Sequence, residues 1–290
     1  MGLQIYIDGK FYEKEQAKIS VLDHGLLYGD GVFEGIRSYN KRVFKMKEHI
    51  DRLYESARAV MLDIPFSKRE ITASAISVLR KNNLNDAYIR LIVTRGMGDL
   101  GLDPRKCGKP SIIIIADKIA LYPRGFYKNG LEIITVPTRR NAPEALRPQV
   151  KSLNYLNNVL AKIEALNSGF EEAIMLNSEG YVTECTGDNI FAVKRGKLFT
   201  PPVHLGVLNG ITKNCVIDIA CAQNLKFSEK VFTRHELFSA DECFLTGTAA
   251  EIIPVVKIDG RIIGKGPPGK ITVKLMDKFR ALTKKEGIKY

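Results

Sequence analysis

The sequence predicts a two-domain protein of the α+β class, and three observations support this. The chain has 290 residues, of which 45% are hydrophobic, so it is long enough to bury two cores of ordinary size. Short β-prone runs and tight turns alternate with blocks in which apolar residues follow helical spacing. A Pro- and Arg-rich stretch without a clear period, residues 138–148, separates the two parts of this pattern.

The first part predicts strands, then two helices, then further strands. A β-prone run over residues 4–12 contains an Asp8-Gly9 turn, and a second hairpin is expected over residues 32–44. Apolar residues then share one face of a helix over residues 50–61, and a second helix begins at the capping box of Ser67 and Glu70. Strands return at 87–94 and 111–116. This part is expected to form a small α/β sandwich domain, residues 1–120.

The second part predicts a larger domain. We expect a strand and connection at 121–137, an interdomain loop at 138–150, and the larger domain at 151–290. A helix marked by apolar residues ends near Gly169, and four strands with hairpin turns follow it. The remaining elements are helices at 211–224 and 270–285 and strands at 226–232, 242–246 and 252–263.

Composition excludes several classes of function. The net charge of +12 is spread among acidic residues along the chain, so it indicates a solvated surface and no nucleic-acid partner. The alternative from a different class of function is a basic nucleic-acid-binding protein whose fold is that of an inactive enzyme. No run has the ~18 apolar residues of a membrane span, and no signal peptide is visible, so we expect a cytoplasmic protein.

The cysteines and histidines do not form a recognisable metal site. Five cysteines without CxxC spacing indicate reduced thiols, and the four histidines lie far apart with no HxxxH pair. We therefore expect no metal. The segment from Gly264 to Lys270 matches GxGxxG, but Pro267 and Pro268 lack the N–H groups that a phosphate loop needs. A turn before the last helix explains this segment better.

Four separated segments have unusual composition. Residues 23–37 contain four glycines, for which backbone close to a ligand and a glycine-rich strand and turn are equally good explanations. Lys151 stands just before a helix, and Glu184 lies among apolar or small strand residues, where a carboxylate needs a partner. Residues 208–212 open a helix, and residues 246–251 form a small-residue turn. Both of these elements suit a phosphate.

In these segments the sequence resembles the class IV aminotransferases, the fold-type IV pyridoxal-phosphate enzymes, and most closely those acting on branched-chain amino acids. Six segments agree in order and approximate spacing over essentially the whole chain: Tyr28 to Arg37, Ala87 to Arg90, Lys151 with Asn154-Tyr155, Glu184 with residues 187–191, Gly210 to Thr212, and Gly247 to Glu251. The resemblance implies a small α/β sandwich domain and a larger β-barrel-like, cofactor-binding domain with flanking helices.

The resemblance also implies roles for individual residues. Lys151 is expected to hold pyridoxal 5'-phosphate covalently and move the proton, and Glu184 is expected to pair with the pyridine nitrogen. The cofactor would be bound by Arg52, Lys151, Tyr155, Glu184, Gly187, Asn189, Leu208, Gly210, Ile211, Thr212, Gly247 and Thr248. The substrate would be bound by Tyr28, Phe33, Gly35, Arg37, Tyr88, Arg90, Tyr122, Thr248 and Ala249.

The implied reaction transfers an amino group between Leu, Ile or Val and 2-oxoglutarate. The segment Lys151-Ser-Leu-Asn154 is also shared with D-amino acid aminotransferases, so transamination of D-amino acids is the alternative. The implied partners are small amino acids and 2-oxo acids, together with a second copy of the chain in a homodimer or a higher even assembly.

Overall fold

The computed structural model describes residues 2–119 and 121–290, which fall into two compact units. Unit 1 comprises Met1–Ile119, Val150–Asn154 and Thr283–Tyr290, and unit 2 comprises Ala120–Gln149 and Tyr155–Leu282. Two segments beyond the predicted first domain, Val150–Asn154 and Thr283–Tyr290, belong to unit 1. The segment that contains Lys151 packs with the first part of the chain, because it pairs with a strand of that part.

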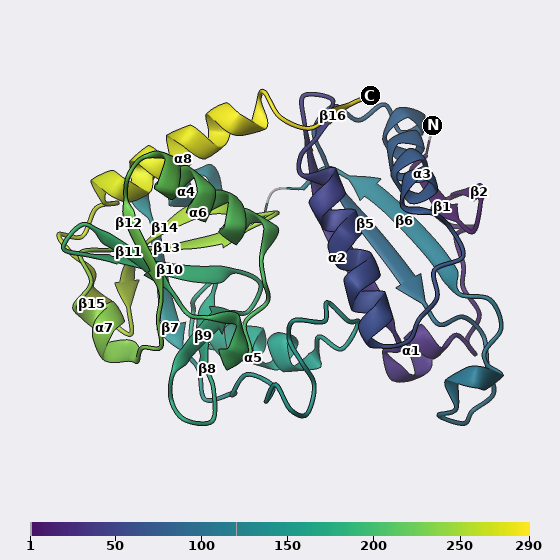
Figure 1. Cartoon of the computed structure of the whole chain (residues 1–290), viewed down its shortest axis with the longest axis horizontal. Coiled ribbons are helices and arrows are strands. Elements are labelled where there is room, and N and C mark those ends of the chain that lie inside the picture. The colour runs from purple at the N-terminus through teal and green to yellow at the C-terminus, as the bar shows by residue number, and fades with distance from the viewer. Residues whose placement is uncertain (1, 120) are drawn as a thin grey trace. The chain divides into compact units, whose positions relative to one another are not determined.

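Unit 1 is built on a seven-stranded antiparallel sheet with the order β16-β4-β3-β5-β6-β1-β2 (Figure 1). Its strands are β1 (Gln4–Ile7), β2 (Lys10–Glu13), β3 (Gly31–Tyr39), β4 (Arg42–Val43), β5 (Ala87–Thr94), β6 (Ser111–Asp117) and β16 (Ile288–Lys289). Its helices are α1 (His24–Tyr28), α2 (Met46–Ala59), α3 (Lys68–Lys81) and the 3-10 turn η1 (Pro104–Lys106).

The core of unit 1 lies between the sheet and the two longer helices. In β5, Ile89, Leu91 and Val93 are fully buried, whereas the residues between them are partly exposed, so the strand has one core face and one outer face. Ile50 and Leu53 of α2 join this core. The predicted capping box at the start of α3 is confirmed, because the side chains of Ser67 and Glu70 each accept a backbone N–H of the other residue.

Unit 2 contains a nine-stranded mixed sheet (Figure 1). Eight of its strands follow the order β12-β11-β10-β13-β14-β7-β8-β9, and the ninth, β15, pairs with β14. Its strands are β7 (Leu131–Thr135), β8 (Ala173–Leu176), β9 (Val182–Cys185), β10 (Asn189–Lys194), β11 (Lys197–Thr200), β12 (Lys226–Glu229), β13 (Glu242–Gly247), β14 (Glu251–Ile258) and β15 (Arg261–Ile262). Its helices are α4 (Arg124–Asn129), α5 (Leu156–Asn167), α6 (Ile211–Ala222), α7 (Arg234–Phe238), α8 (Lys270–Thr283, whose last residue belongs to unit 1) and the 3-10 turn η2 (Val203–Leu205).

The sheet of unit 2 is buried along its middle strands. Residues 190–193 of β10 have at most 1% exposure, and the ring of Phe191 stacks on that of Phe244 in β13 at 5.0 Å between centroids. Such fully buried strands are apolar on both faces, which explains why their sequence lacks alternation. The mixture of helices and sheets confirms the predicted α+β class.

Two observations concern the described part of the chain, residues 2–119 and 121–290. None of its helices is long and apolar enough to cross a membrane. Over the same residues, no group of three or more His, Cys, Asp or Glu side chains is placed to hold a metal ion. The five cysteines are free, and Cys185, Cys215 and Cys243 are buried.

Unit 2 also buries a pair of carboxyl groups. Glu172 and Asp188 are 2% and 5% exposed, and the hydroxyl of Tyr122 lies 3.3 Å from a carboxyl oxygen of each. The second oxygen of Glu172 accepts the backbone N–H groups of Ala173 and Thr186. Burial and the neighbouring Glu172 raise the pKa of Asp188 to about 7. Asp188 is therefore largely protonated in the folded chain over much of the acidic range.

This cluster predicts a pH dependence of stability. The folded chain holds the Asp188 proton more tightly than the unfolded chain, so the contribution of Asp188 to stability is complete below its ordinary pKa of 3.8 and is lost as the pH rises through about 7. Asp188→Asn is expected to flatten this decline. Urea unfolding midpoints between these two pH values test it, with Glu179→Gln, a change at an exposed carboxyl of the same unit, as the control. Equal slopes for wild type and Asp188→Asn would contradict the assignment.

Candidate active site

In unit 1, the backbone around Lys151 is fixed against the edge of β3. The N–H of Phe33 donates to the carbonyl of Lys151 at 2.9 Å, and the N–H of Leu153 donates to the carbonyl of Gly31 at 3.0 Å. The N–H of Lys151 donates in turn to the hydroxyl of Ser56 on α2 at 3.2 Å. A lysine in an irregular segment is thereby held by both a strand and a helix.

The Lys151 amine lies over an aromatic ring. Its Nζ is 4.6 Å from the centroid of Phe33, and the guanidinium carbon of Arg90 is also 4.6 Å from that centroid. Arg90 contacts the ring of Tyr88 at 5.5 Å as well. The ring faces of Phe33 and Tyr88 thus hold cations next to apolar surface.

The outer face of the unit 1 sheet brings together five of the predicted substrate residues. Phe33, Gly35 and Arg37 alternate along one face of β3, and Gly35 and Arg37 stand opposite Arg90 and Tyr88 of β5. A Cβ atom on Gly35 would lie 1.8 Å from the Tyr88 hydroxyl, so the absence of a side chain at position 35 allows that hydroxyl its place. These five residues form a surface that combines apolar rings with guanidinium groups.

The predicted residue Tyr28 lies elsewhere in unit 1. It ends the short helix α1 at 37% exposure, and its hydroxyl donates to the carbonyl of Leu100. Its ring contacts that of His24, with 5.0 Å between the centroids. Tyr28 is therefore attached to the loop that contains Leu100 and is not part of the five-residue face.

Arg52 belongs to a buried triad with Glu34 and His49. The Glu34 carboxylate accepts the Nε and Nη2 protons of Arg52 at 2.7 and 2.8 Å, and the Nδ1 proton of His49 at 2.7 Å. Burial alone would raise the pKa of Glu34, but Arg52 and His49 lower it to about 2. Burial also lowers the pKa of His49, an effect that Glu34 opposes and that the charges of Arg52 and Lys151 reinforce. The triad is an ionised Glu34–Arg52 pair with a neutral imidazole.

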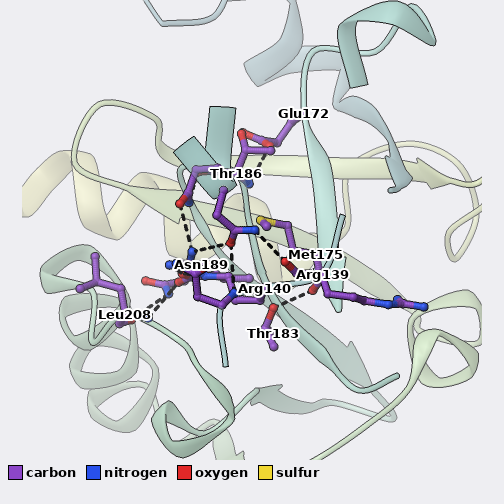
Figure 2. Close-up of polar contacts among 12 residues, drawn as sticks. Arg139, Arg140, Glu172, Met175, Thr183, Thr186, Asn189 and Leu208 are labelled. Atoms are coloured by element: carbon purple, nitrogen blue, oxygen red, sulfur yellow. Dashed lines mark hydrogen bonds and ion pairs between the residues drawn. The ribbon is translucent and has the colours of Figure 1, made fainter. Parts of the chain in front are cut away.

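In unit 2, four donors surround the carboxylate of Glu184. Its Oε1 accepts from Nε and Nη2 of Arg140 at 2.9 and 2.7 Å. Its Oε2 accepts from the Asn189 side-chain amide at 3.2 Å and from the N–H of Leu208 at 3.0 Å. Arg140, Asn189 and Leu208, which are labelled in Figure 2, reach this carboxylate from three separate segments. A buried carboxylate is thereby held in one orientation.

Arg140 is itself tied to the helix that follows the lysine segment. Its Nη1 donates to the side-chain carbonyls of Asn157 and Asn158 on α5 at 3.3 and 3.0 Å. Asn158 in turn donates to the carbonyl of Thr186 at 2.8 Å. Arg140 thus links the Pro- and Arg-rich stretch, α5 and β9.

Two of the three glycines predicted in unit 2 occur where side chains approach the backbone closely. A Cβ on Gly210 would lie 2.0 Å from the amide oxygen of Asn189, and one on Gly247 would lie 1.9 Å from a carboxyl oxygen of Asp188. A Cβ on Gly187 would meet nothing within 4 Å, so sterics do not explain that glycine. Leu208 joins this network through its backbone, because its carbonyl accepts from Asn189 at 3.0 Å.

Two elements of unit 2 have the form of anion sites. Helix α6 begins at Ile211 with Gly210 as its N-cap, which supplies no side-chain hydrogen bond, so the positive end of the helix dipole has no capping group at Ile211 and Thr212. Strand β13 ends in a turn that contains Thr248 and Ala249. The hydroxyl of Thr246 just before it is buried, and no partner for it exists among the described residues.

The two remaining predicted tyrosines have different environments. Tyr155 is the partly exposed residue immediately before α5. Tyr122 is 5% exposed in the core of unit 2, where its hydroxyl faces Glu172 and Asp188.

The sequence analysis missed three residues that hold the others in place: Arg140, Glu34 and His49. A signal existed for Glu34, because it stands between Val32 and Ile36 at core positions of a strand, where a carboxylate needs a cationic partner. His49 precedes Arg52 by three residues and so shares its helix face. Arg140 lies in a stretch without periodicity, so the sequence does not indicate which way its side chain points.

The chain is similar to proteins of known type over nearly its whole length. The model of the family described as amino-transferase class IV matches residues 31–258. A protein of Methanocaldococcus jannaschii, provisionally named a branched-chain-amino-acid aminotransferase, is 55% identical over 287 residues, which cover 99% of both chains.

Solved structures agree with this result. The branched-chain amino acid aminotransferase of Escherichia coli has a TM-score of 0.95 at 36% identity, covering 98% of this chain and 95% of that one. The branched-chain amino acid aminotransferase of Thermobaculum terrenum, in its PLP-bound holo-form, has a TM-score of 0.87 at 31% identity, covering 97% of this chain and 94% of that one. The chain belongs to the class IV aminotransferases.

Proposed function

We propose that this chain transfers the amino group between the branched-chain L-amino acids Leu, Ile and Val and 2-oxoglutarate, with pyridoxal 5'-phosphate as its cofactor. The observation that carries the proposal is the carboxylate of Glu184, which Arg140, Asn189 and Leu208 hold in one orientation. Such a group suits the protonated ring nitrogen of the cofactor. The free cysteines support a reducing compartment, and we place the enzyme in the cytoplasm.

The residues present fit this cofactor. The buried Thr246 hydroxyl, which has no partner among the described residues, adjoins the turn with Thr248, and α6 presents an uncapped N-terminus. In the proposal, Arg52, Ile211, Thr212 and Thr248 bind the phosphate, and Tyr155 binds the phenolic oxygen. Gly187, Gly210 and Gly247 shape the backbone around these groups.

Each protein group has a separate task in the proposed reaction. When bound, pyridoxal phosphate supplies a ring that accepts the electrons left behind when the substrate loses its α-proton. Lys151 would hold the cofactor covalently through its Nζ, and once the amino group of the substrate has displaced it, the freed amine would take up the α-proton and later give it back. Glu184 keeps the ring nitrogen protonated, and the N–H groups of Thr248 and Ala249 with the Tyr88 hydroxyl bind the substrate carboxylate.

The unit 1 sheet face accounts for two kinds of substrate side chain. The rings of Phe33 and Tyr88 offer apolar surface for a branched side chain, with Tyr28 and Tyr122 as the other proposed wall residues. Arg90, which lies over the Phe33 ring at 4.6 Å, supplies a cation for the γ-carboxylate of 2-oxoglutarate, and Arg37 lies on the same face.

The function is tested with an amino-donor panel. We expect the purified chain to be yellow and to aminate 2-oxoglutarate from L-Leu, L-Ile and L-Val, with D-Ala inactive. Borohydride should fix the cofactor to wild type, whereas Lys151→Ala should lose both this label and measurable turnover, because the reacting amine is gone. Lys109→Ala, a change at an exposed lysine, should behave as wild type. Activity confined to D-amino acids, or full turnover of Lys151→Ala, would overturn the proposal.

The pairing of Arg140 with Glu184 gives a second prediction. Arg140→Met keeps most of the side-chain volume but removes two of the four donors to Glu184, so the carboxylate loses its countercharge and its fixed orientation. We expect kcat to fall about 10- to 100-fold, by analogy with the residues that orient metal ligands, with little change in KM. Arg140→Lys, which keeps the charge, should recover part of the loss. Steady-state kinetics and the pH titration of the bound cofactor's absorbance measure this effect, and wild-type kcat in Arg140→Met refutes it.

We further propose a homodimer or a higher even assembly. Helix α5 exposes five apolar side chains at helical spacing, with exposed fractions of 46–70%: Leu156, Val159, Leu160, Ile163 and Leu166. A contiguous apolar helix face of this kind is typical of a protein contact. The occupant that fits the proposal is the same helix face of a second copy, which would match it in kind and in area.

Charge on this helix face should disrupt the assembly. We expect Ile163→Glu to yield a smaller species in sedimentation velocity than wild type, because an interface buries the new carboxylate without a partner. Ile262→Glu changes a residue of unit 2 that is exposed to 64% and lies outside α5, and should leave the mass unchanged. A monomeric wild type, or an unchanged assembly in Ile163→Glu, would exclude this contact.

A further inference from the structure

Glu34 occupies a position on β3 where an apolar residue would be expected. Its neighbours on the same face of the strand, Val32 and Ile36, are fully buried in the core of unit 1, and Glu34 is 0% exposed between them. A carboxylate at such a position is costly unless it is paired. Its partners are Arg52 and His49 on α2, which belong to the same buried helix face.

Stability alone does not account for these three polar residues. Replacing a buried ion pair by well-packed apolar residues is often neutral or stabilising, so this part of the core could be apolar without loss. The geometry shows what the pair does provide. Glu34 engages the Nε and Nη2 edge of the guanidinium, which turns the Nη1 edge away from the carboxylate. The Arg52 side chain keeps 10% exposure, whereas the Glu34 side chain keeps none.

His49 restrains the carboxylate from a second direction. Its Nδ1 donates to Oε2, the same oxygen that accepts Nη2 of Arg52, so rotation of the carboxylate would break bonds to both partners. The same helix face also holds the lysine segment, because Ser56, one turn beyond Arg52, accepts the N–H of Lys151. One face of α2 therefore carries the Arg52 guanidinium and also holds the backbone of Lys151.

We propose that Glu34 and His49 are positioning residues that aim the guanidinium of Arg52 at the phosphate of the cofactor. This inference rests on the proposed assignment of Arg52 to that phosphate. Neither residue touches the cofactor in the proposal. Each acts through Arg52, and their removal should weaken recognition of the phosphate more than recognition of the ring.

The test compares two ligands that differ only in the phosphate. The full-length chain, freed of cofactor, is titrated with pyridoxal phosphate and with pyridoxal, and the ratio of the two Kd values is measured for each variant. Glu34→Gln places an amide N–H against the donors of Arg52 and His49, so the guanidinium loses its fixed orientation. We expect this variant to lower the preference for the phosphorylated ligand about 10- to 100-fold, and His49→Gln to lower it less.

Two further variants separate this inference from the assignment on which it rests. Arg52→Met should abolish the preference for the phosphorylated ligand, and an intact preference would refute the assignment of Arg52 itself. Asp30→Asn is the matched control, because it breaks a two-bond pair with buried Arg95 in the same unit, at 2.9 and 3.0 Å. It should leave the ratio as in wild type. A loss in Arg52→Met without a loss in Glu34→Gln would overturn the positioning role alone.

A measurement on the unsubstituted chain covers the case in which Glu34→Gln fails to fold. The wild-type chain with ¹⁵N-labelled histidine has four imidazoles, and the His49 signals are assigned by their absence in His49→Gln. We expect a neutral ring protonated at Nδ1, whose signals move on addition of pyridoxal phosphate or inorganic phosphate and stay in place with pyridoxal. A charged ring, or equal shifts with both pyridoxal ligands, would overturn the inference.

Discussion

A buried carboxylate held by an arginine is the interaction on which both units depend. In unit 1 the pair is Glu34 with Arg52, and in unit 2 it is Glu184 with Arg140. In each case the arginine uses its Nε and Nη2 atoms, so that a planar fork fixes the direction of both groups. Such pairs add little net stability, but they define orientation, which is the property that a catalytic site requires.

The two pairs use this orientation in opposite ways. In unit 1 the carboxylate is the hidden partner, with 0% exposure, and in our proposal the cation carries out the binding. In unit 2 the carboxylate is the acting group in our proposal, and Arg140, which is anchored through Asn157 and Asn158 to α5, is its support. Substitution of the supporting member should therefore change how well the acting group works without removing it.

Sequence patterns predicted most of the helices and strands, because interactions between residues close in the sequence determine these elements. The capping box at Ser67 and the strand at 87–94 are local features, and the structure confirms them. The environment of Arg140 depends on contacts between distant segments, which periodicity does not encode. Helix α5 shows the same limit: its apolar spacing predicted the helix, but not that the apolar face is exposed in a single chain. Amphipathicity reveals that a face needs covering and does not identify what covers it.

In our proposal, the outer face of the unit 1 sheet allows one site to accept two chemically different side chains. Phe33 has cations near its ring from both Lys151 and Arg90, each at 4.6 Å, so its apolar surface lies beside positive charge. A branched side chain can pack on the rings, whereas a γ-carboxylate can pair with a guanidinium already stacked on them. Gly35 permits this arrangement, because any side chain there would displace the Tyr88 hydroxyl. In this proposal, the branched-chain donor and the 2-oxoglutarate acceptor are distinguished by the part of the shared surface that each side chain contacts.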